Sequence, residues 1–183
     1  MKTTNNYRGI IGFTVLYAVT SFACAFTGFI HPWCWIVAFP ALAALLGAYS
    51  YCEVAVRWRK FGVGTLLSVV LGGFLLAMGE CDLTQSGLMV VAGIVSDGVR
   101  QSLGNDDIQS LRFSYPILSV GLIAWIMKLW TDTEWYIQGA TEELNAAYAQ
   151  GLEQLSGVWG LALAIAATAV AAYLGVRIRL RLV

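Results

Sequence analysis

Apolar residues are gathered into long runs that short polar segments separate. A helix needs about 20 apolar residues to cross the hydrocarbon core of a bilayer. Six runs are expected to form transmembrane helices, at residues 9–30, 36–56, 61–79, 86–99, 113–130 and 158–176. Because Asp97 and Arg100 lie at the end of the fourth run, five spans with a re-entrant fourth segment are the alternative. The pattern predicts an all-α integral membrane protein, a bundle of six transmembrane helices in one domain, residues 1–183.

Charged residues are divided between the two sets of helix ends. With the N-terminus inside, ten of the eleven basic residues are cytoplasmic and only Lys128 is not. The ten are Lys2, Arg8, Arg57, Arg59, Lys60, Arg100, Arg112, Arg177, Arg179 and Arg181. The acidic residues expected outside are Glu80, Asp82, Asp132, Glu134, Glu142, Glu143 and Glu153. The distribution predicts a multi-pass plasma-membrane protein with both termini cytoplasmic.

Composition agrees with a lipid environment and narrows the function. The chain is 58% hydrophobic and 12% charged, about half the charge of a soluble domain. Its net charge of zero gives no indication of nucleic-acid binding. No phosphate-binding loop is present, and one histidine cannot build a His-rich catalytic metal site. We therefore expect a binding subunit that uses another protein's energy source, not an enzyme.

Small residues recur every fourth position on three of the predicted helices. They are Gly64, Ser68 and Gly72 on the third, Ala167, Ala171 and Gly175 on the sixth, and Ala44 and Ala48 on the second. Such faces let helix backbones approach closely in lipid. They serve either packing inside the bundle or docking of a partner membrane protein.

The longest loop, residues 131–157, carries a helical pattern of its own. Its apolar positions are Ile137, Ala140, Leu144, Ala147, Tyr148, Leu152 and Leu155. This spacing predicts an extracellular amphipathic helix from Trp135 to Leu155, with Gly139 and Gly151 as candidate hinges. The helix either lies in the membrane interface or covers an outward-facing cavity.

Four stretches resemble a known family in sequence and in order. They are "FPALAALLGAYSYCEVAVRWRKFG" from Phe39, "GIVSDGVR" from Gly93, "LRFSYPILSVG" from Leu111 and the closing "AAYLGVRIRLRL". The chain resembles the MptD-like (Trep_Strep) group of S-components of energy-coupling factor transporters. The resemblance implies a substrate-binding subunit that captures a micronutrient outside and associates with a transmembrane coupling subunit and two ATPases. Better-known S-components dock through Ala-x-x-x-Ala on the first helix, where this chain has only Thr14 and Ala18 at that spacing.

The stretch "HPWCW", His31 to Trp35, is the leading candidate for the rim of a ligand cavity. Some relatives in the group are associated with haem uptake, which makes haem the first candidate as transported ligand, with no intrinsic cofactor. His31 and Cys34 are then the candidate iron ligands, and Trp33 and Trp35 the apolar walls. The other candidate ligand-binding residues are Glu80, Asp82, Trp135, Tyr136 and Tyr148. The alternative is an aromatic belt with no ligand to bind.

Other interpretations stay open at this stage. The acids Glu80 and Asp82 favour a cationic or vitamin-like organic ligand over haem. A structural or regulatory membrane protein without a transport role is a further alternative. Cys34 and Cys81 could form an extracellular disulfide. Asp97 and Arg100, one turn apart, are expected to pair as a salt bridge or to dock a partner.

Overall fold

The computed structural model describes residues 3–105 and 107–181, and every regular element within these ranges is a helix. Lys2, one of the predicted cytoplasmic charges, lies outside the described residues. Because every regular element in the described ranges is a helix, the all-α prediction is confirmed. In chain order the elements are α1 (Thr3–Ala25), η1 (Phe26–Phe29), η2 (Cys34–Ala38), α2 (Phe39–Arg57), α3 (Val63–Met78), α4 (Leu83–Leu103), η3 (Ile108–Ser110), α5 (Leu111–Val120), η4 (Gly121–Ile126), α6 (Lys128–Thr131), α7 (Thr133–Glu143), α8 (Ala146–Leu155) and α9 (Val158–Arg181).

Three helical segments among the described residues are long and apolar enough to cross a membrane. They are Tyr7–Phe29, Cys34–Arg57 and Val158–Arg181, and Val63–Met78 is a shorter apolar helix. These four match the first, second, sixth and third predicted spans. Helix α4 is longer than its predicted span but carries Gln85, Asp97 and Arg100, and the fifth span is divided among α5, η4 and α6. The number of six spans therefore stays a prediction.

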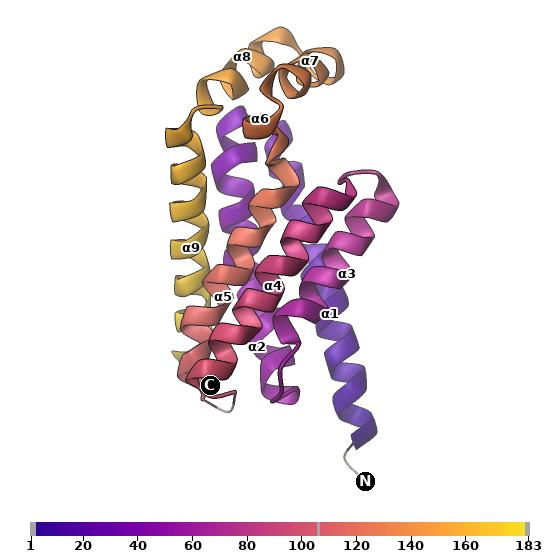
Figure 1. Ribbon diagram of the computed structural model, residues 1–183, viewed down its shortest axis with the longest axis vertical. Coiled ribbons are helices and arrows are strands. Elements are labelled where there is room, and N and C mark those ends of the chain that lie inside the picture. The colour runs from indigo at the N-terminus through magenta and orange to yellow at the C-terminus, as the bar shows by residue number, and fades with distance from the viewer. Residues whose placement is uncertain (1–2, 106, 182–183) are drawn as a thin grey trace.

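The long helices run side by side (Figure 1), and their contacts close a ring. Contacts run from α1 to α2, then to α9, α5, α4 and α3, and back to α1, while α2 also meets α5 across the ring. Helices α7 and α8 lie across one end, and both described chain ends lie at the other (Figure 1). The fold thus has one covered end and one end that carries the short connections between α2 and α3 and between α4 and α5.

Three tyrosines fill the middle of the ring. Tyr17, Tyr51 and Tyr115 are each almost wholly buried. The Tyr115 hydroxyl donates to the Ala44 carbonyl at 2.7 Å, and the Tyr51 and Ser114 hydroxyls are 2.8 Å apart. Buried hydroxyls need such partners because an unpaired polar group in an apolar interior costs free energy. The centre of the bundle is therefore filled by packed side chains.

The small residues of α3 pack against α4. A β-carbon at Gly93 would lie 2.4 Å from the Ser68 hydroxyl and 2.6 Å from the Gly64 carbonyl oxygen. At this crossing only glycine lets the two backbones approach so closely. The packing interpretation of the face Gly64, Ser68 and Gly72 is confirmed.

The corresponding face of α9 is displaced from the predicted one. Gly175 lies against Ala48 and the Leu45 backbone of α2 as expected. The fully buried residues preceding it are Ala164, Thr168 and Ala172, and Ala167 and Ala171 are only half-buried. On α1, Thr14 and Ala18 are buried inside the bundle. Their spacing is used for internal packing, so it provides no free docking face.

Asp97 and Arg100 do not pair with each other, contrary to the salt-bridge prediction. The Asp97 carboxylate accepts from the backbone N–H groups of Gly64 (2.7 Å) and Thr65 (2.8 Å) and from the Thr65 hydroxyl (2.7 Å). It therefore satisfies and electrostatically stabilises the N-terminus of α3.

Arg100 binds backbone on the other side of the turn between α2 and α3, at the end of α2. It donates to the carbonyls of Ala55 (3.0 Å) and Asn105 (2.9 Å), with longer contacts to those of Trp58 and Lys60. Three of these four carbonyls belong to the end of α2 and the turn that follows it. Both charges are thus used to hold backbone, which the sequence spacing alone could not indicate.

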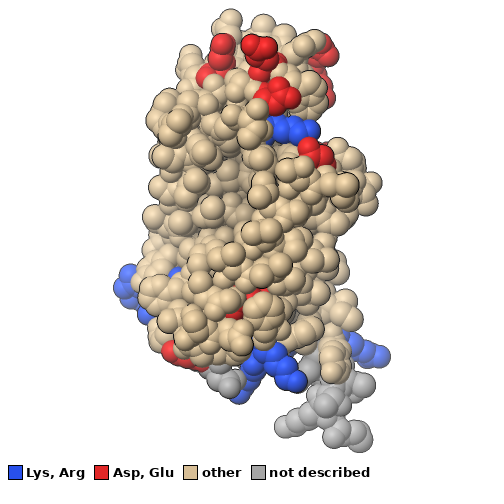
Figure 2. Space-filling model, in the orientation of Figure 1, with Lys and Arg blue, Asp and Glu red and all other residues tan. Residues whose placement is uncertain are grey.

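Charge is segregated along the molecule. Figure 2 shows the acidic side chains gathered mainly at the end that α7 and α8 cover, with most of the visible basic side chains at the opposite end. At the basic end Glu53 pairs with both Arg57 and Arg179, and so joins α2 to α9. The segregation agrees with the predicted grouping of charges.

The α3–α4 crossing gives a direct test of the packing. We expect Gly93→Ala to lower stability by about 1–3 kcal/mol, because the added methyl group overpacks a backbone contact. Gly98→Ala on the same helix is the control, since a β-carbon there meets no atom within 4 Å. The control should be neutral or slightly stabilising through helix propensity. Thermal unfolding in detergent measures both, and equal midpoints for the two variants would contradict the close crossing.

Candidate functional site

The "HPWCW" stretch forms the start of the helix that continues into α2. His31 is the residue before the first turn, and its Nδ1 accepts the backbone N–H of Trp33 at 3.2 Å. Pro32 follows at the first helical position, where its missing N–H costs nothing. His31 therefore has a structural role as a helix cap, and its Nε2 is the nitrogen left for other partners.

A π turn, η2, follows the cap. The Phe39 N–H donates to the Cys34 carbonyl, five residues back, instead of to Trp35. Pro40, at the first turn of α2, has no N–H to donate and its ring crowds the preceding turn. A wider turn accommodates that ring. The turn also sets the direction in which Trp35 projects from the helix.

The outer amphipathic segment is two helices, not the single helix predicted from Trp135 to Leu155. Helix α7 ends at Glu143, and Asn145 then caps α8 by accepting the Tyr148 N–H at 2.8 Å. The break lies where an asparagine can start a new helix. Gly139 and Gly151, the predicted hinges, lie inside α7 and α8.

The two outer helices close over the "HPWCW" corner, and we call them the lid, residues 133–155. The Trp35 indole N–H donates to the Tyr136 hydroxyl at 2.6 Å, and the Tyr148 hydroxyl donates to the Gly28 carbonyl at 2.5 Å. Burial raises the pKa of Tyr136 to about 12 and also raises that of Tyr148. The Tyr148 hydroxyl therefore keeps the proton that it donates to the Gly28 carbonyl.

Packing reinforces the two hydrogen bonds. A β-carbon at Gly151 would lie 2.6 Å from Pro32 Cγ, so α8 rests directly on the proline ring. The Trp130 indole N–H donates to the Leu155 carbonyl at 3.2 Å, and Leu152 and Leu155 are buried. Of the predicted apolar face, Ile137, Ala140 and Tyr148 are half-buried, whereas Leu144 and Ala147 are exposed. These contacts hold α7 and α8 against the end of the bundle, with the apolar face of α8 packed on protein.

Beneath the lid lies a cluster of aromatic rings from five segments. Trp35 stacks on Phe39 with centroids 5.1 Å apart, and Trp125 meets Phe39 edge-on at 5.1 Å. Phe22 extends the cluster, since its ring stacks on Trp125 at 6.2 Å and meets Phe74 edge-on at 5.4 Å. Apolar and aromatic walls with a few polar groups are typical of small-molecule sites.

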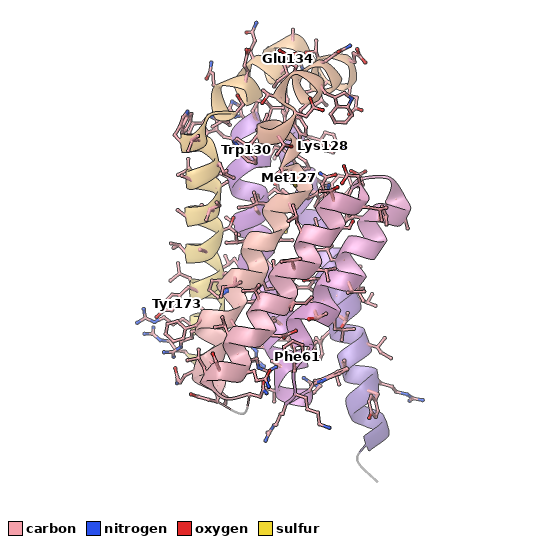
Figure 3. All side chains as sticks on the ribbon, viewed as in Figure 1. Phe61, Met127, Lys128, Trp130, Glu134 and Tyr173 are labelled. Carbon is pink, nitrogen blue, oxygen red and sulfur yellow. The ribbon has the colours of Figure 1, made fainter. Side chains whose placement is uncertain are left out.

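The predicted acidic rim is partly neutralised. Asp82 caps α4 by accepting the Gln85 N–H at 2.8 Å, and Lys128 Nζ lies 3.1 Å from its other carboxylate oxygen. These two contacts, the cap first, hold the pKa of Asp82 below its usual value. Lys128 also lies 4.6 Å from the centre of the Trp135 ring, a cation–π contact. Lys128, the one basic residue that was not predicted to be cytoplasmic, thus links α4, α6 and α7. Figure 3 shows it just below α7.

Eight of the nine predicted ligand-binding residues divide into two groups. Trp35, Cys34, Tyr136 and Tyr148 lie at or next to the contact between the lid and the bundle. His31, Trp33, Glu80 and Trp135 are exposed, and Trp33 pairs with Trp159 at 5.8 Å on the outer surface. The structure therefore brings together four of the nine predicted ligand-binding residues and leaves Asp82 as a cap.

The cysteines are free thiols, so the Cys34–Cys81 disulfide is not formed. Burial raises the pKa of Cys81 to about 12, with Asp82 and Glu80 adding to the effect. Among the described residues no group of three or more His, Cys, Asp or Glu side chains is arranged to hold a metal ion. A haem iron needs only one or two protein ligands, so His31 and Cys34 stay candidates for that role alone.

Sequence reasoning missed Phe22, Phe39, Phe74 and Trp125. Each lies within a predicted span, where an aromatic residue is indistinguishable from ordinary lipid-facing or core packing. Gly28 and Gly151 were also missed as contact points for the lid. Gly28 could have been indicated by its position between Phe26 and Phe29, just before Pro32, whereas no neighbour of Gly151 in the sequence gives such a signal.

The lid contact can be tested through Cys34. We expect Gly151→Ala to raise the rate at which a maleimide labels Cys34 several-fold, because the added methyl group pushes α8 away from Pro32. Gly139→Ala is the matched control, since its β-carbon would meet no atom within 4 Å. Mass spectrometry of the labelled protein gives the rates, with the buried Cys24 and Cys52 as internal references. Wild-type labelling in both variants would contradict the closed lid.

Comparison with known proteins gives the family. No curated protein and no solved structure is significantly similar to the chain. Residues 9–183 match the model of a family described as hypothetical bacterial integral membrane protein (Trep_Strep). Since the match covers nearly the whole sequence, this chain belongs to the Trep_Strep family of bacterial integral membrane proteins.

Proposed function

We propose that the protein is the substrate-binding S-component of an energy-coupling factor importer. It captures a micronutrient outside the cell and delivers it through a shared module of one transmembrane coupling subunit and two ATPases. It is a transporter subunit without an ATPase of its own, and not an enzyme. The observation that carries the proposal is the lid closed over an aromatic cluster, at the end of the bundle opposite most of the basic residues.

The proposal includes an orientation. Six helices cross the membrane, α4 and the α5–α6 segment among them, with both termini in the cytoplasm and the lid outside. The positive-inside rule supports this, since ten of eleven basic residues then lie inside. Membrane-impermeant maleimide applied to intact cells should label Cys34 in the Gly151→Ala variant. If Cys34 is labelled only after the cells are opened, the orientation is reversed.

Haem is the first candidate for the ligand. An array of flat aromatic rings suits a planar apolar macrocycle. His31 Nε2 is the nitrogen available for iron, because Nδ1 holds the Trp33 N–H. Cys34 is the second candidate iron ligand. The pairing of Asp82 with Lys128 removes part of the negative charge that would oppose the haem propionates.

A cationic or vitamin-like organic ligand is the second candidate. The observation that favours it is the acidic surface of the lid end, which Figure 2 shows. Exposed carboxylates there attract cations from solution and raise their local concentration. Indole faces below the lid would then stabilise a bound cation.

Association with an energy-coupling module is the test of the function. The affinity-tagged protein, expressed in its native cells, should co-purify with a transmembrane coupling subunit and two ATPases. Uptake of its ligand by proteoliposomes of that complex should require ATP. A chain that purifies alone from cells that contain such a module would support the structural or regulatory alternative.

Haem binding can be separated from helix capping by two substitutions. Haem added to the purified protein should give a shifted Soret band, and both His31→Ala and His31→Asn should abolish the shift if His31 binds the iron. Asparagine caps helices well but lacks the imidazole. A shift lost in His31→Ala and kept in His31→Asn would show that His31 acts only through the cap. No shift in the wild-type protein would exclude haem and direct the search to organic cations.

A further inference from the structure

A small pocket of about 80 Å³ lies at the basic end of the bundle, far from the lid. It is bounded by the end of α2 and by the connection between α4 and α5. Its lining residues are Ala55, Val56, Arg59, Arg100, Asn105, Asp107, Ile108 and Leu111. The proposed transport function makes no use of this pocket.

Arg100 gives the pocket a buried positive charge. The residue is 1% exposed, and within the part of the chain that the structure describes its two terminal nitrogens donate to neutral backbone carbonyls. Its Nε–H is buried and has no hydrogen-bond partner in that part of the chain. No carboxylate among the described residues lies within ion-pair distance, since Asp97 binds the start of α3. Burying a guanidinium with an unpaired N–H donor costs free energy, unless an anion accepts from that donor and balances the charge.

The rest of the lining extends this chemistry. Arg59 is exposed and adds a second guanidinium, and its Nε makes only a long contact to the Val56 carbonyl (3.3 Å). Asn105 is half-buried with its Oδ1 enclosed and unpaired among the described residues, and rotation of the amide would offer N–H donors instead. Asp107 is the opposing carboxylate, and its Oδ1 is occupied by the Gln109 N–H. Among the described lining residues, two guanidinium groups stand against one carboxylate, and this balance attracts an anion.

The pocket also has an apolar border. Val56 and Ile108, both lining residues, are 47% and 49% exposed. A site with guanidinium groups inside and apolar side chains at its edge matches a molecule with a compact anionic group and an apolar chain. We propose that this pocket binds the phosphate group of an anionic lipid at the basic end of the bundle. Arginine is well suited to this role because its fork of donors fits phosphate oxygens.

The test compares three probes on the detergent-purified protein. Short-chain phosphatidylglycerol should raise the thermal unfolding midpoint in a saturable way, while phosphatidylcholine of the same chain length should not. Inorganic phosphate is the third probe. A response to phosphatidylglycerol alone assigns the site to a lipid headgroup, and a response to both shows that the free oxyanion suffices. Either result supports a phosphate site, and no response to any probe would overturn it.

Two pairs of variants locate the response in the pocket. Asn105→Asp supplies an internal counterion beside Arg100 and should abolish the response to phosphatidylglycerol. Gln101→Glu makes the same change of charge at an exposed position on α4 outside the pocket. This control should keep most of the response to phosphatidylglycerol. Arg100 itself is kept, because it holds the turn after α2.

Arg59→Gln should weaken binding about fivefold, the effect of ~1 kcal/mol for one surface cation near an anionic lipid. Arg177→Gln, an exposed cation at the same end, is its control. In 0.5 M salt the effect of Arg177→Gln should disappear while that of Arg59→Gln persists, since open surface charges are screened. Equal effects of Arg59→Gln and Arg177→Gln, or a full response in Asn105→Asp, would contradict the proposal.

Discussion

The turn between α2 and α3 imposes the strongest physical constraint on this bundle. A helix ends with backbone carbonyls and begins with N–H groups that have no partner within the helix, and in apolar surroundings each one left unpaired is costly. Here both sets are satisfied from a single neighbouring helix, because Asp97 accepts from the start of α3 and Arg100 donates to the end of α2. The spacing of three residues on α4 places the two side chains one turn apart, so α4 must run beside this turn. That requirement fixes the α3–α4 crossing at Gly64 and Gly93, from which the closure of the ring follows.

The sequence predicted what depends on periodicity and length. The helical class, the long apolar segments and an outer amphipathic region all follow from patterns that need no knowledge of neighbours. The hydrogen-bond partners of charged side chains could not be predicted in this way. The spacing of Asp97 and Arg100 is compatible with a mutual ion pair, and only the arrangement of three helices shows that each binds backbone groups. The break before Asn145 was missed because apolar positions continue across it, although asparagine followed by alanines is a common way to start a helix. The motifs "GAYSYCE" and "LRFSYP" contribute Tyr51, Ser114 and Tyr115 to one buried cluster, so part of the family resemblance reflects packing.

The candidate ligand site combines two kinds of contact with different strengths. Neutral hydrogen bonds of tyrosine and tryptophan hold the lid against the bundle. They add little net free energy of stabilisation, because water would replace them if the lid opened. The aromatic cluster beneath the lid is stabilised because water is excluded from its rings. An apolar ligand bound there would exclude water in the same way. Charged contacts are confined to the rim, where Lys128 links Asp82 to the face of Trp135. A closure of this kind is stable without a ligand and can still be released.

The π turn at Cys34–Ala38 has a consequence for how the site can change. A π turn holds one residue more than an α turn, so it rotates everything before it by about 100° relative to α2. Loss of one residue here would restore a regular helix and leave α2 in place, but would rotate His31 to Cys34 to another side of the molecule. The residues of the "HPWCW" corner can therefore be re-aimed as a set, while the helices that hold the bundle keep their registers. An insertion or deletion of a single residue would move the whole corner, whereas a substitution would change one contact.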